Sequence, residues 1–236
     1  MKALFFAVLG AVAVACSSTK TTYVTEPDPS VADAGADSGP DAAAGLGALG
    51  FRPATAYSGF DGTHTYRVPV AVYNAGADLT VTADDPGAAD VTATALLNPT
   101  KDGVTDAGQY FLVTTKKAGT ITLTARTNGQ TATSTITVTS YATDRWTTGQ
   151  QRYLNGEGGD PPCTDCHAGT SGIDHSPAAL ATVTDDAVGV TITTGVSPGG
   201  NTILVDGKPG HKWTVTAAEL PGLVTYLRAL APKGFE

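Results

Sequence analysis

The stretch PPCTDCHAG, residues 161–169, combines two of the chain's three cysteines with one of its four histidines. Cys163 and Cys166 lie three positions apart, and His167 follows directly. Thiolate and imidazole groups bind soft and borderline metals, exchange disulfides and form covalent bonds to cofactors. This stretch therefore carries the most specific chemistry in the sequence.

The pattern Cys-x-x-Cys-His is the attachment signature of c-type haem. At this spacing the sulfurs of Cys163 and Cys166 can reach the two vinyl groups on one porphyrin edge and form thioethers. The adjoining His167 is then held beneath the iron and supplies its proximal ligand. The motif predicts one covalently bound haem c.

Three other interpretations of the two cysteines compete with haem attachment. A redox-active thiol pair of the thioredoxin type would follow a strand within a βαβ pattern, and that pattern is missing from this sequence. A zinc site would combine Cys163 and Cys166 with two of the histidines, because structural zinc takes four nitrogen or sulfur ligands. A disulfide between the two cysteines would close a small, strained ring.

A second axial ligand of the iron has to come from the remaining histidines. The one methionine is Met1, which would leave with a signal peptide. His211, eight residues before Glu219, is the first candidate, and His175, eight residues after His167, is the alternative. An iron with an open position is the third possibility. Ligation by two histidines gives a lower reduction potential than ligation by methionine, and it favours electron transfer over substrate chemistry.

The N-terminus predicts an export signal. Lys2 precedes an apolar run, residues 3–14, that is too short to span a bilayer. The run ends in AVAC, and these small residues before Cys16 resemble the lipobox of bacterial lipoproteins. The resemblance implies a signal peptide at 1–15, a lipid on Cys16 and anchoring to the outer membrane, on its periplasmic side or at the cell surface. An ordinary signal peptide with another cleavage site is the alternative.

Residues 16–49 have almost no large apolar side chains and are dominated by Ala, Asp, Gly, Pro and Ser. Such a segment cannot bury enough surface to offset its ordering entropy, so a flexible tether is expected here. The formal net charge of the whole chain is −8. This charge argues against a nucleic-acid partner and favours a protein partner with a basic face.

Residues 50–140 contain short runs in which apolar and polar residues alternate, which is the pattern of strands with one buried face. Asn128 and Gly129 separate two such runs and predict a β-hairpin. Strands at this spacing favour a β-sandwich. The predicted strands span residues 66–72, 79–83, 90–96, 110–115, 120–127 and 131–140.

The order of ADDPGAADVTA, YFLVTTKKAGTITLTART and TATSTITVT resembles the bacterial Ig-like (BIG-type) domain. The resemblance implies a sandwich that serves as a spacer or adhesion module, and it implies no catalytic residues. His64, in DGTHTYR, is predicted to be a surface loop residue.

Residues 141–236 change to helical patterns, with helices predicted over 143–154, 184–195 and 216–230. Thr216 and Glu219 have the spacing of a capping box at the start of the last helix. The second of these helices is short and rich in β-branched residues, so it is a poor helix former. It is expected to end at Gly195.

This C-terminal part resembles a small class I cytochrome c. The family opens with a helix carrying Gly-x-x-x-aromatic, matched by Gly149 and Tyr153, and closes with a helix bearing a Tyr-Leu pair, matched by Tyr226 and Leu227. The resemblance implies that the two helices cross, with the glycine allowing close approach. The segment NGEGGDPP before Cys163 is longer than usual, and the family's axial methionine is missing.

The sequence thus predicts a multidomain chain, an Ig-like β-sandwich (50–140) followed by a small mainly α-helical cytochrome c domain (141–236). The expected function is single-electron transfer through one haem c, tethered to the membrane by its lipid anchor, with redox proteins as partners. No enzymatic activity is expected. The alternatives are a haem peroxidase or gas sensor with an open coordination site, and a surface adhesion protein with an accessory haem.

Overall fold

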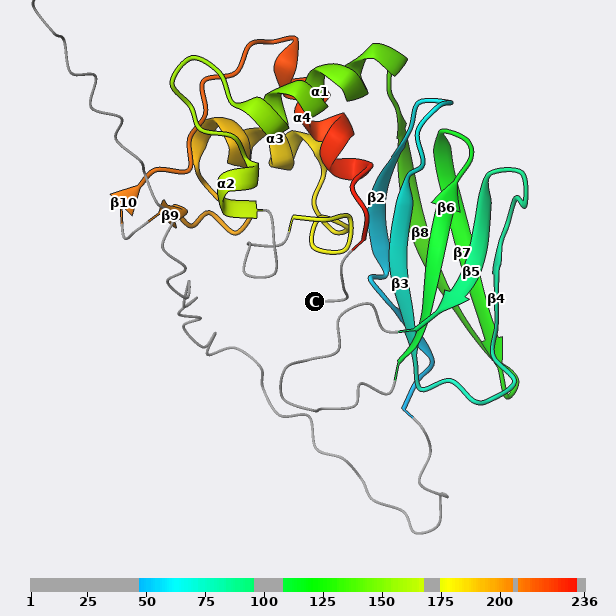
Figure 1. Ribbon diagram of the computed structural model, residues 1–236. Coiled ribbons are helices and arrows are strands. Elements are labelled where there is room, and N and C mark those ends of the chain that lie inside the picture. Colours follow the sequence, from blue (N-terminus) through cyan, green and yellow to red (C-terminus); the bar gives the residue numbers. More distant parts are fainter. Residues whose placement is uncertain (1–46, 96–107, 168–174, 206–207, 233–236) are drawn as a thin grey trace, which may run out of the picture.

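The computed structural model describes residues 47–95, 108–167, 175–205 and 208–232 (Figure 1). The predicted signal peptide, the lipidation site at Cys16 and nearly all of the predicted tether lie outside these residues. Among the described residues, no helix has the length and apolar character that crossing a membrane requires.

Two four-stranded sheets form the first half of the described chain (Figure 1). All strand pairs in them are antiparallel except β2 and β8, which are parallel. One sheet has the order β1 (Gly50–Arg52), β3 (Arg67–Tyr73), β6 (Gln109–Thr115), β5 (Ala89–Thr94). The other has the order β2 (Thr55–Phe60), β8 (Gln130–Ser140), β7 (Gly119–Thr127), β4 (Thr80–Ala83).

The core of this β-sandwich follows the predicted alternation. In β7, Ile121, Leu123 and Ala125 are buried while Thr122 and Thr124 between them are only partly covered. The side chains that point inward from the facing sheet include Val70 and Val113. Burial of these apolar faces is the main force that holds the two sheets together.

The hairpin between β7 and β8 turns at the predicted residues. Asn128 and Gly129 have φ angles of 46° and 73°, the left-handed conformation that a tight hairpin turn requires. All six predicted strands are present with small shifts at their ends, whereas β1 and β2 were not predicted.

Strand β2 is the edge at which the C-terminal part of the chain packs (Figure 1). Tyr57 donates its backbone N–H to the carbonyl of Ala181 at 2.8 Å. The Arg228 guanidinium donates to the carbonyls of Tyr57, Leu180 and Val183 and forms an ion pair with Asp185. Because Arg228 is 1% exposed, these partners compensate for the burial of its charge.

The C-terminal part contains helices α1 (Thr143–Asn155), α2 (Thr164–His167), α3 (Asp185–Thr194) and α4 (Glu219–Arg228). A small two-stranded sheet joins β9 (Leu204–Val205) to β10 (Lys208–Pro209). The segments between these elements are turns and irregular backbone.

The expected fold class, an Ig-like β-sandwich followed by a small mainly α-helical cytochrome c domain, is wrong. The structure is dominated by two β-sheets, and the described residues form only four short helices, one of them a single turn of four residues. Between α3 and α4 the sequence VSPGGNTI forms a β-bridge between Val196 and Thr202. Proline and glycine disfavour a helix there. A mainly α-helical cytochrome domain is therefore not supported.

Individual helix ends nevertheless agree with the local signals. Thr184 caps α3 by accepting the N–H of Ala187, and Gly195 ends that helix with a φ of 70°. Before α4, Thr216 and Glu219 exchange reciprocal hydrogen bonds of 2.7 and 3.2 Å between side chain and backbone. These are the two bonds of a capping box, so that prediction is confirmed.

Candidate functional site

The predicted site residues Cys163, His167, His175 and His211 line one cavity that is partly open to solvent, whereas Cys166 is not among its lining residues. Segments far apart in the sequence build it. The lining residues are Arg152, Tyr153, Cys163, His167, His175, Ile192, His211, Trp213, Leu223 and Leu227.

Helix α1 connects to the Cys-x-x-Cys-His segment through the backbone. Cys163 donates its N–H to the carbonyl of Tyr153, at 3.0 Å, and accepts the N–H of His167, also at 3.0 Å. The one-turn helix α2 therefore starts beside the end of α1 and turns the His167 ring, 8% exposed, into the cavity wall.

The two cysteines of the motif are in different states. Cys163 is a free thiol, and Cys166 is disulfide-bonded. A disulfide between these two residues is therefore not formed. Burial raises the pKa of the Cys163 thiol to about 11, and the positive charge of Arg152 only partly opposes this. A thiol that stays protonated at neutral pH is unlike the low-pKa thiolates of thioredoxin-type redox pairs.

The His175 ring stacks face to face on the His167 ring. Their centroids are 3.8 Å apart and their planes differ by 8°. In this arrangement the two imidazoles cannot point a nitrogen at one metal ion from opposite sides. The His175 Nε2 also lies 2.6 Å from the Tyr153 hydroxyl. The geometry thus favours a packing and hydrogen-bonding role for His175.

His211 has a different relation to His167. Their ring centroids are 6.0 Å apart and the planes are nearly perpendicular, at 83°. Two imidazoles on opposite sides of one metal ion, each with a metal–nitrogen bond of about 2 Å, have centroids roughly 6 Å apart. The distance between the rings would allow both imidazoles to bind one metal ion.

The His211 ring is also prepared to act as a neutral ligand. Burial, and next the nearby His167, lower its pKa, while the carbonyl of Thr191 opposes the shift. Metals bind the neutral imidazole. The Nδ1 atom of His211 is buried and has no hydrogen-bond partner among the residues that the structure describes. An unpaired buried nitrogen costs free energy, which a ligand in the cavity would recover.

The end of α3 fixes the segment that carries His211. A Cβ atom on Gly195 would lie 2.4 Å from the His211 carbonyl oxygen, so this residue has to be glycine for the two backbones to touch. Trp213, two residues after His211, donates its backbone N–H to the carbonyl of Ile192 at 3.0 Å.

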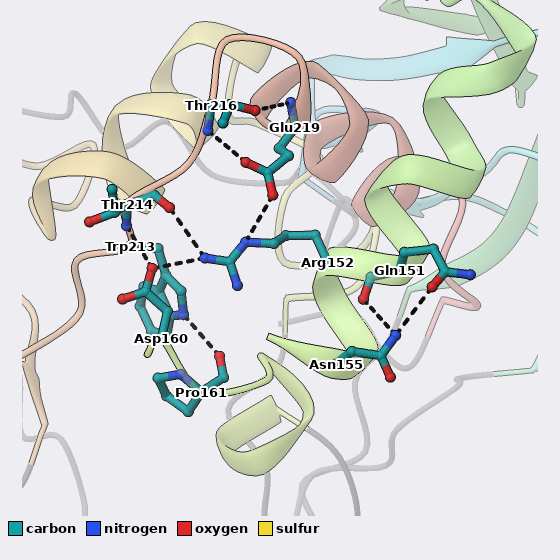
Figure 2. A network of polar contacts seen from close by, with 9 residues as sticks. All are labelled: Gln151, Arg152, Asn155, Asp160, Pro161, Trp213, Thr214, Thr216 and Glu219. Carbon is teal, nitrogen blue, oxygen red and sulfur yellow. Dashed lines mark hydrogen bonds and ion pairs between the residues drawn. The ribbon is translucent and has the colours of Figure 1, made fainter. Parts of the chain in front are cut away.

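A polar network closes another wall of the cavity (Figure 2). The Arg152 side chain is 2% exposed; it pairs with Asp160 at 2.8 Å and with Glu219 at 3.5 Å. Asp160 also accepts the N–H of Thr214 at 2.8 Å, and the Trp213 indole donates to the carbonyl of Pro161 at 3.1 Å. The network joins α1 and the approach to the cysteines to the segment that follows His211.

The zinc interpretation finds no support in this geometry. No group of three or more His, Cys, Asp or Glu side chains is arranged to hold a metal ion in the described part of the chain, which includes both cysteines of the motif. A structural zinc site needs four such ligands around one point. The residues that line the cavity are of the types that hold a haem: the sulfur of Cys163, the imidazoles of His167 and His211, and the apolar side chains of Leu223 and Leu227.

One site residue and one contact outside the site do not follow from the sequence. The burial of Arg152 depends on carboxylates from other segments. His64, predicted as a surface loop residue, stacks on Trp146 with centroids 4.0 Å apart, and its Nδ1 lies 2.6 Å from an Asp61 carboxylate oxygen. No local signal in DGTHTYR indicates the contact with Trp146.

Comparison with known proteins gave no family. No protein-family model matches the chain, and no curated protein matches it. Among solved structures, domains 1–6 of the surface layer protein SbsC match with 14% identity and a TM-score of 0.31, over 41% of this chain and 13% of that one. The M1 domain from titin matches with 10% identity and a TM-score of 0.27, over 40% of this chain and 95% of that domain.

An endo-fucoidan hydrolase of glycoside hydrolase family 107 also matches, with 19% identity and a TM-score of 0.27, over 42% of this chain and 15% of the hydrolase. The chain thus spans only a small part of the surface layer protein and of the hydrolase. All three likenesses are distant.

Proposed function

We propose that this chain is a c-type cytochrome that transfers single electrons through one covalently bound haem and is not an enzyme. The observation that carries the proposal is the meeting of Cys163, His167 and His211 at one cavity, with the two imidazole rings 6.0 Å apart. The Cys-x-x-Cys-His motif supplies the attachment chemistry.

Each side chain has a defined part in this proposal. Cys163 and Cys166 would hold the haem covalently, and His167 and His211 would be the two axial ligands. When bound, the haem supplies a one-electron redox centre. Leu223 and Leu227, both buried in α4, line the cavity with apolar surface. Two protein ligands leave no iron position for a substrate, which favours transfer over catalysis.

The proposed setting is the outer membrane, reached through an export signal at 1–15 and a lipid on Cys16. The net charge of −8 favours redox partners with a basic docking face. The sandwich would act as a spacer between the anchor and the partner.

Expression of the full chain in a host that matures c-type cytochromes tests the proposal. We expect haem staining of the denatured protein and a mass increase of one haem. Cys163→Ser combined with Cys166→Ser should abolish covalent attachment, whereas Thr164→Ser, an exchange within the same motif, should leave it intact. A full chain without covalent haem in such a host would contradict the proposal.

Mass analysis of peptides from the mature protein shows whether Cys166 is bound to haem or in a disulfide. The proposed thioether uses the sulfur that the structure places in a disulfide, so the two bonds are mutually exclusive. Peptide mapping under non-reducing conditions should find Cys166 joined to haem. A mature protein with Cys166 in a disulfide and Cys163 free would overturn the haem assignment.

A further inference from the structure

Six aromatic rings form a continuous column from the cavity to the sandwich. Consecutive members are in ring contact at each step. In order from the cavity they are His167, His175, Tyr153, Tyr226, Trp146 and His64.

The spacing within this aromatic column is close throughout. From the cavity end, the five centroid distances are 3.8, 5.2, 5.1, 5.3 and 4.0 Å. These are the distances of rings in direct van der Waals contact. A hydrogen bond of 2.6 Å between Tyr153 and His175 adds to the second step.

The two ends of the aromatic column differ in their surroundings. At one end, His167 is a cavity-wall residue of the Cys-x-x-Cys-His motif. At the other end, the His64 side chain is 25% exposed and belongs to the loop between β2 and β3. Asp61 holds that loop by accepting the N–H groups of Thr63 and His64 and the hydroxyl of Tyr66. The column therefore leads from the site to a fixed surface loop of the sandwich.

Helices α1 and α4 keep the middle of the column in register. Trp146 and Tyr153 project from α1, and Tyr226 projects from α4 and contacts both. The direct backbone contact between these helices, at Gly149 and Gly222, leaves the three rings little freedom to separate.

We propose that the aromatic column is the path by which electrons pass between the haem site and a redox partner docked at the loop of residues 61–65. This inference rests on the proposed function and adds the partner's docking site. Electron tunnelling falls steeply with distance and is more efficient through packed atoms than through gaps or water. The column of rings in contact therefore offers a continuous packed route from the cavity to the loop.

The transfer is balanced without any further reactant. With haem bound, one electron would pass from the reduced haem to the acceptor protein at the loop, so that the haem would be oxidised by one unit and the acceptor reduced by one unit. No proton moves, and the rings are not themselves oxidised.

Flash photolysis of a labelled chain tests the path. A ruthenium bipyridyl complex is attached to the histidine introduced by Thr65→His, an exposed position next to His64. Photogenerated ruthenium(III) then takes one electron from the reduced haem. We expect Trp146→Leu and Tyr226→Leu each to lose most of this transfer rate. Tyr57→Leu, at the same junction but outside the column, should keep it.

Two further readouts separate the possible failures. In the haem-free chain, the proton resonances of His64 should show an upfield ring-current shift that Trp146→Leu removes and Tyr57→Leu retains. A chain that never binds haem would contradict the proposed function. The ring-current shift would still show whether His64 stacks on Trp146 in the column. A haem-loaded chain whose transfer rate is unchanged in both Trp146→Leu and Tyr226→Leu overturns the path.

Discussion

Gly149 in α1 and Gly222 in α4 are in direct backbone contact, and a Cβ atom on Gly149 would lie 1.9 Å from the Gly222 carbonyl oxygen. This approach brings the two helices close enough for Tyr153 and Tyr226 to pack ring against ring, with centroids 5.1 Å apart. The close approach expected at Gly149 from the cytochrome resemblance is thus present, although the fold class expected with it is not.

Gly149→Ala should destabilise the chain by about 3 kcal/mol, because the added methyl group forces the two helix backbones apart. The gain in helix propensity, about 1 kcal/mol, offsets only part of this cost. Urea denaturation followed by circular dichroism measures the difference.

Gly189→Ala provides the matched control for that helix contact. Gly189 is also a buried helical glycine, but a Cβ there would meet Leu220 at 3.5 Å, an ordinary contact. We expect this variant to be neutral or more stable by up to about 1 kcal/mol. Equal destabilisation by both substitutions would refute the role assigned to the Gly149–Gly222 contact.

A second prediction concerns the junction between the sandwich and α4. Arg228→Met removes the guanidinium that pairs with Asp185 and leaves the carbonyls of Leu180 and Val183 without their donor. Such a loss costs about 3–5 kcal/mol when the partner groups are buried. Arg145→Met, on the exposed face of α1, should change stability by less than about 0.5 kcal/mol. A similarly small effect at Arg228 would show that the junction does not depend on this side chain.

The local features of the fold were predictable because each depends on a few neighbouring residues. The hairpin at Asn128–Gly129, the αL end of α3 at Gly195 and the capping box before α4 are examples. The first two depend on left-handed backbone conformation and the third on hydrogen bonds between side chain and backbone, and each involves residues only a few positions apart in the sequence.

The features that could not be predicted depend on partners distant in sequence. An arginine in a helical pattern is ordinarily expected at the surface, and Arg152 and Arg228 are buried only because other segments supply their acceptors. The same reason applies to the stacking of His64 on Trp146. The composition between the helices, rich in Gly, Pro and Thr, was the available signal against a mainly α-helical domain.

Because of Asp61, the free energy of unfolding should change with pH in the acidic range. Burial alone would raise the pKa of this carboxyl, but the hydrogen bonds from His64, Thr63 and Tyr66 together bring it below the ordinary value of 3.8. The depressed pKa contributes stability that is fully present above pH 3.8. That contribution is lost as the pH falls through the lower folded-state value.

Asp61→Asn tests this dependence. The variant should be less stable than the parent at pH 7, and the difference should shrink as the pH falls below 3.8. Denaturant midpoints measured from pH 7 down to pH 3 provide the comparison, with Asp144→Asn, at an exposed position in α1, as control. A difference between Asp61→Asn and the parent that stays constant over this range would contradict the assigned shift.

The last prediction distinguishes the two candidate axial histidines. If His211 is the second ligand, His211→Ala opens one coordination position of the haem-loaded chain, and the reduced protein then binds carbon monoxide. His175→Ala removes a stacked ring and the hydrogen bond to Tyr153 but no ligand, so the parent's spectrum should persist without carbon monoxide binding. Optical spectra of both reduced variants, before and after addition of the gas, measure the difference. The reverse pattern would assign the ligand to His175. It would also mean that the stacked His167 and His175 rings move apart when haem binds.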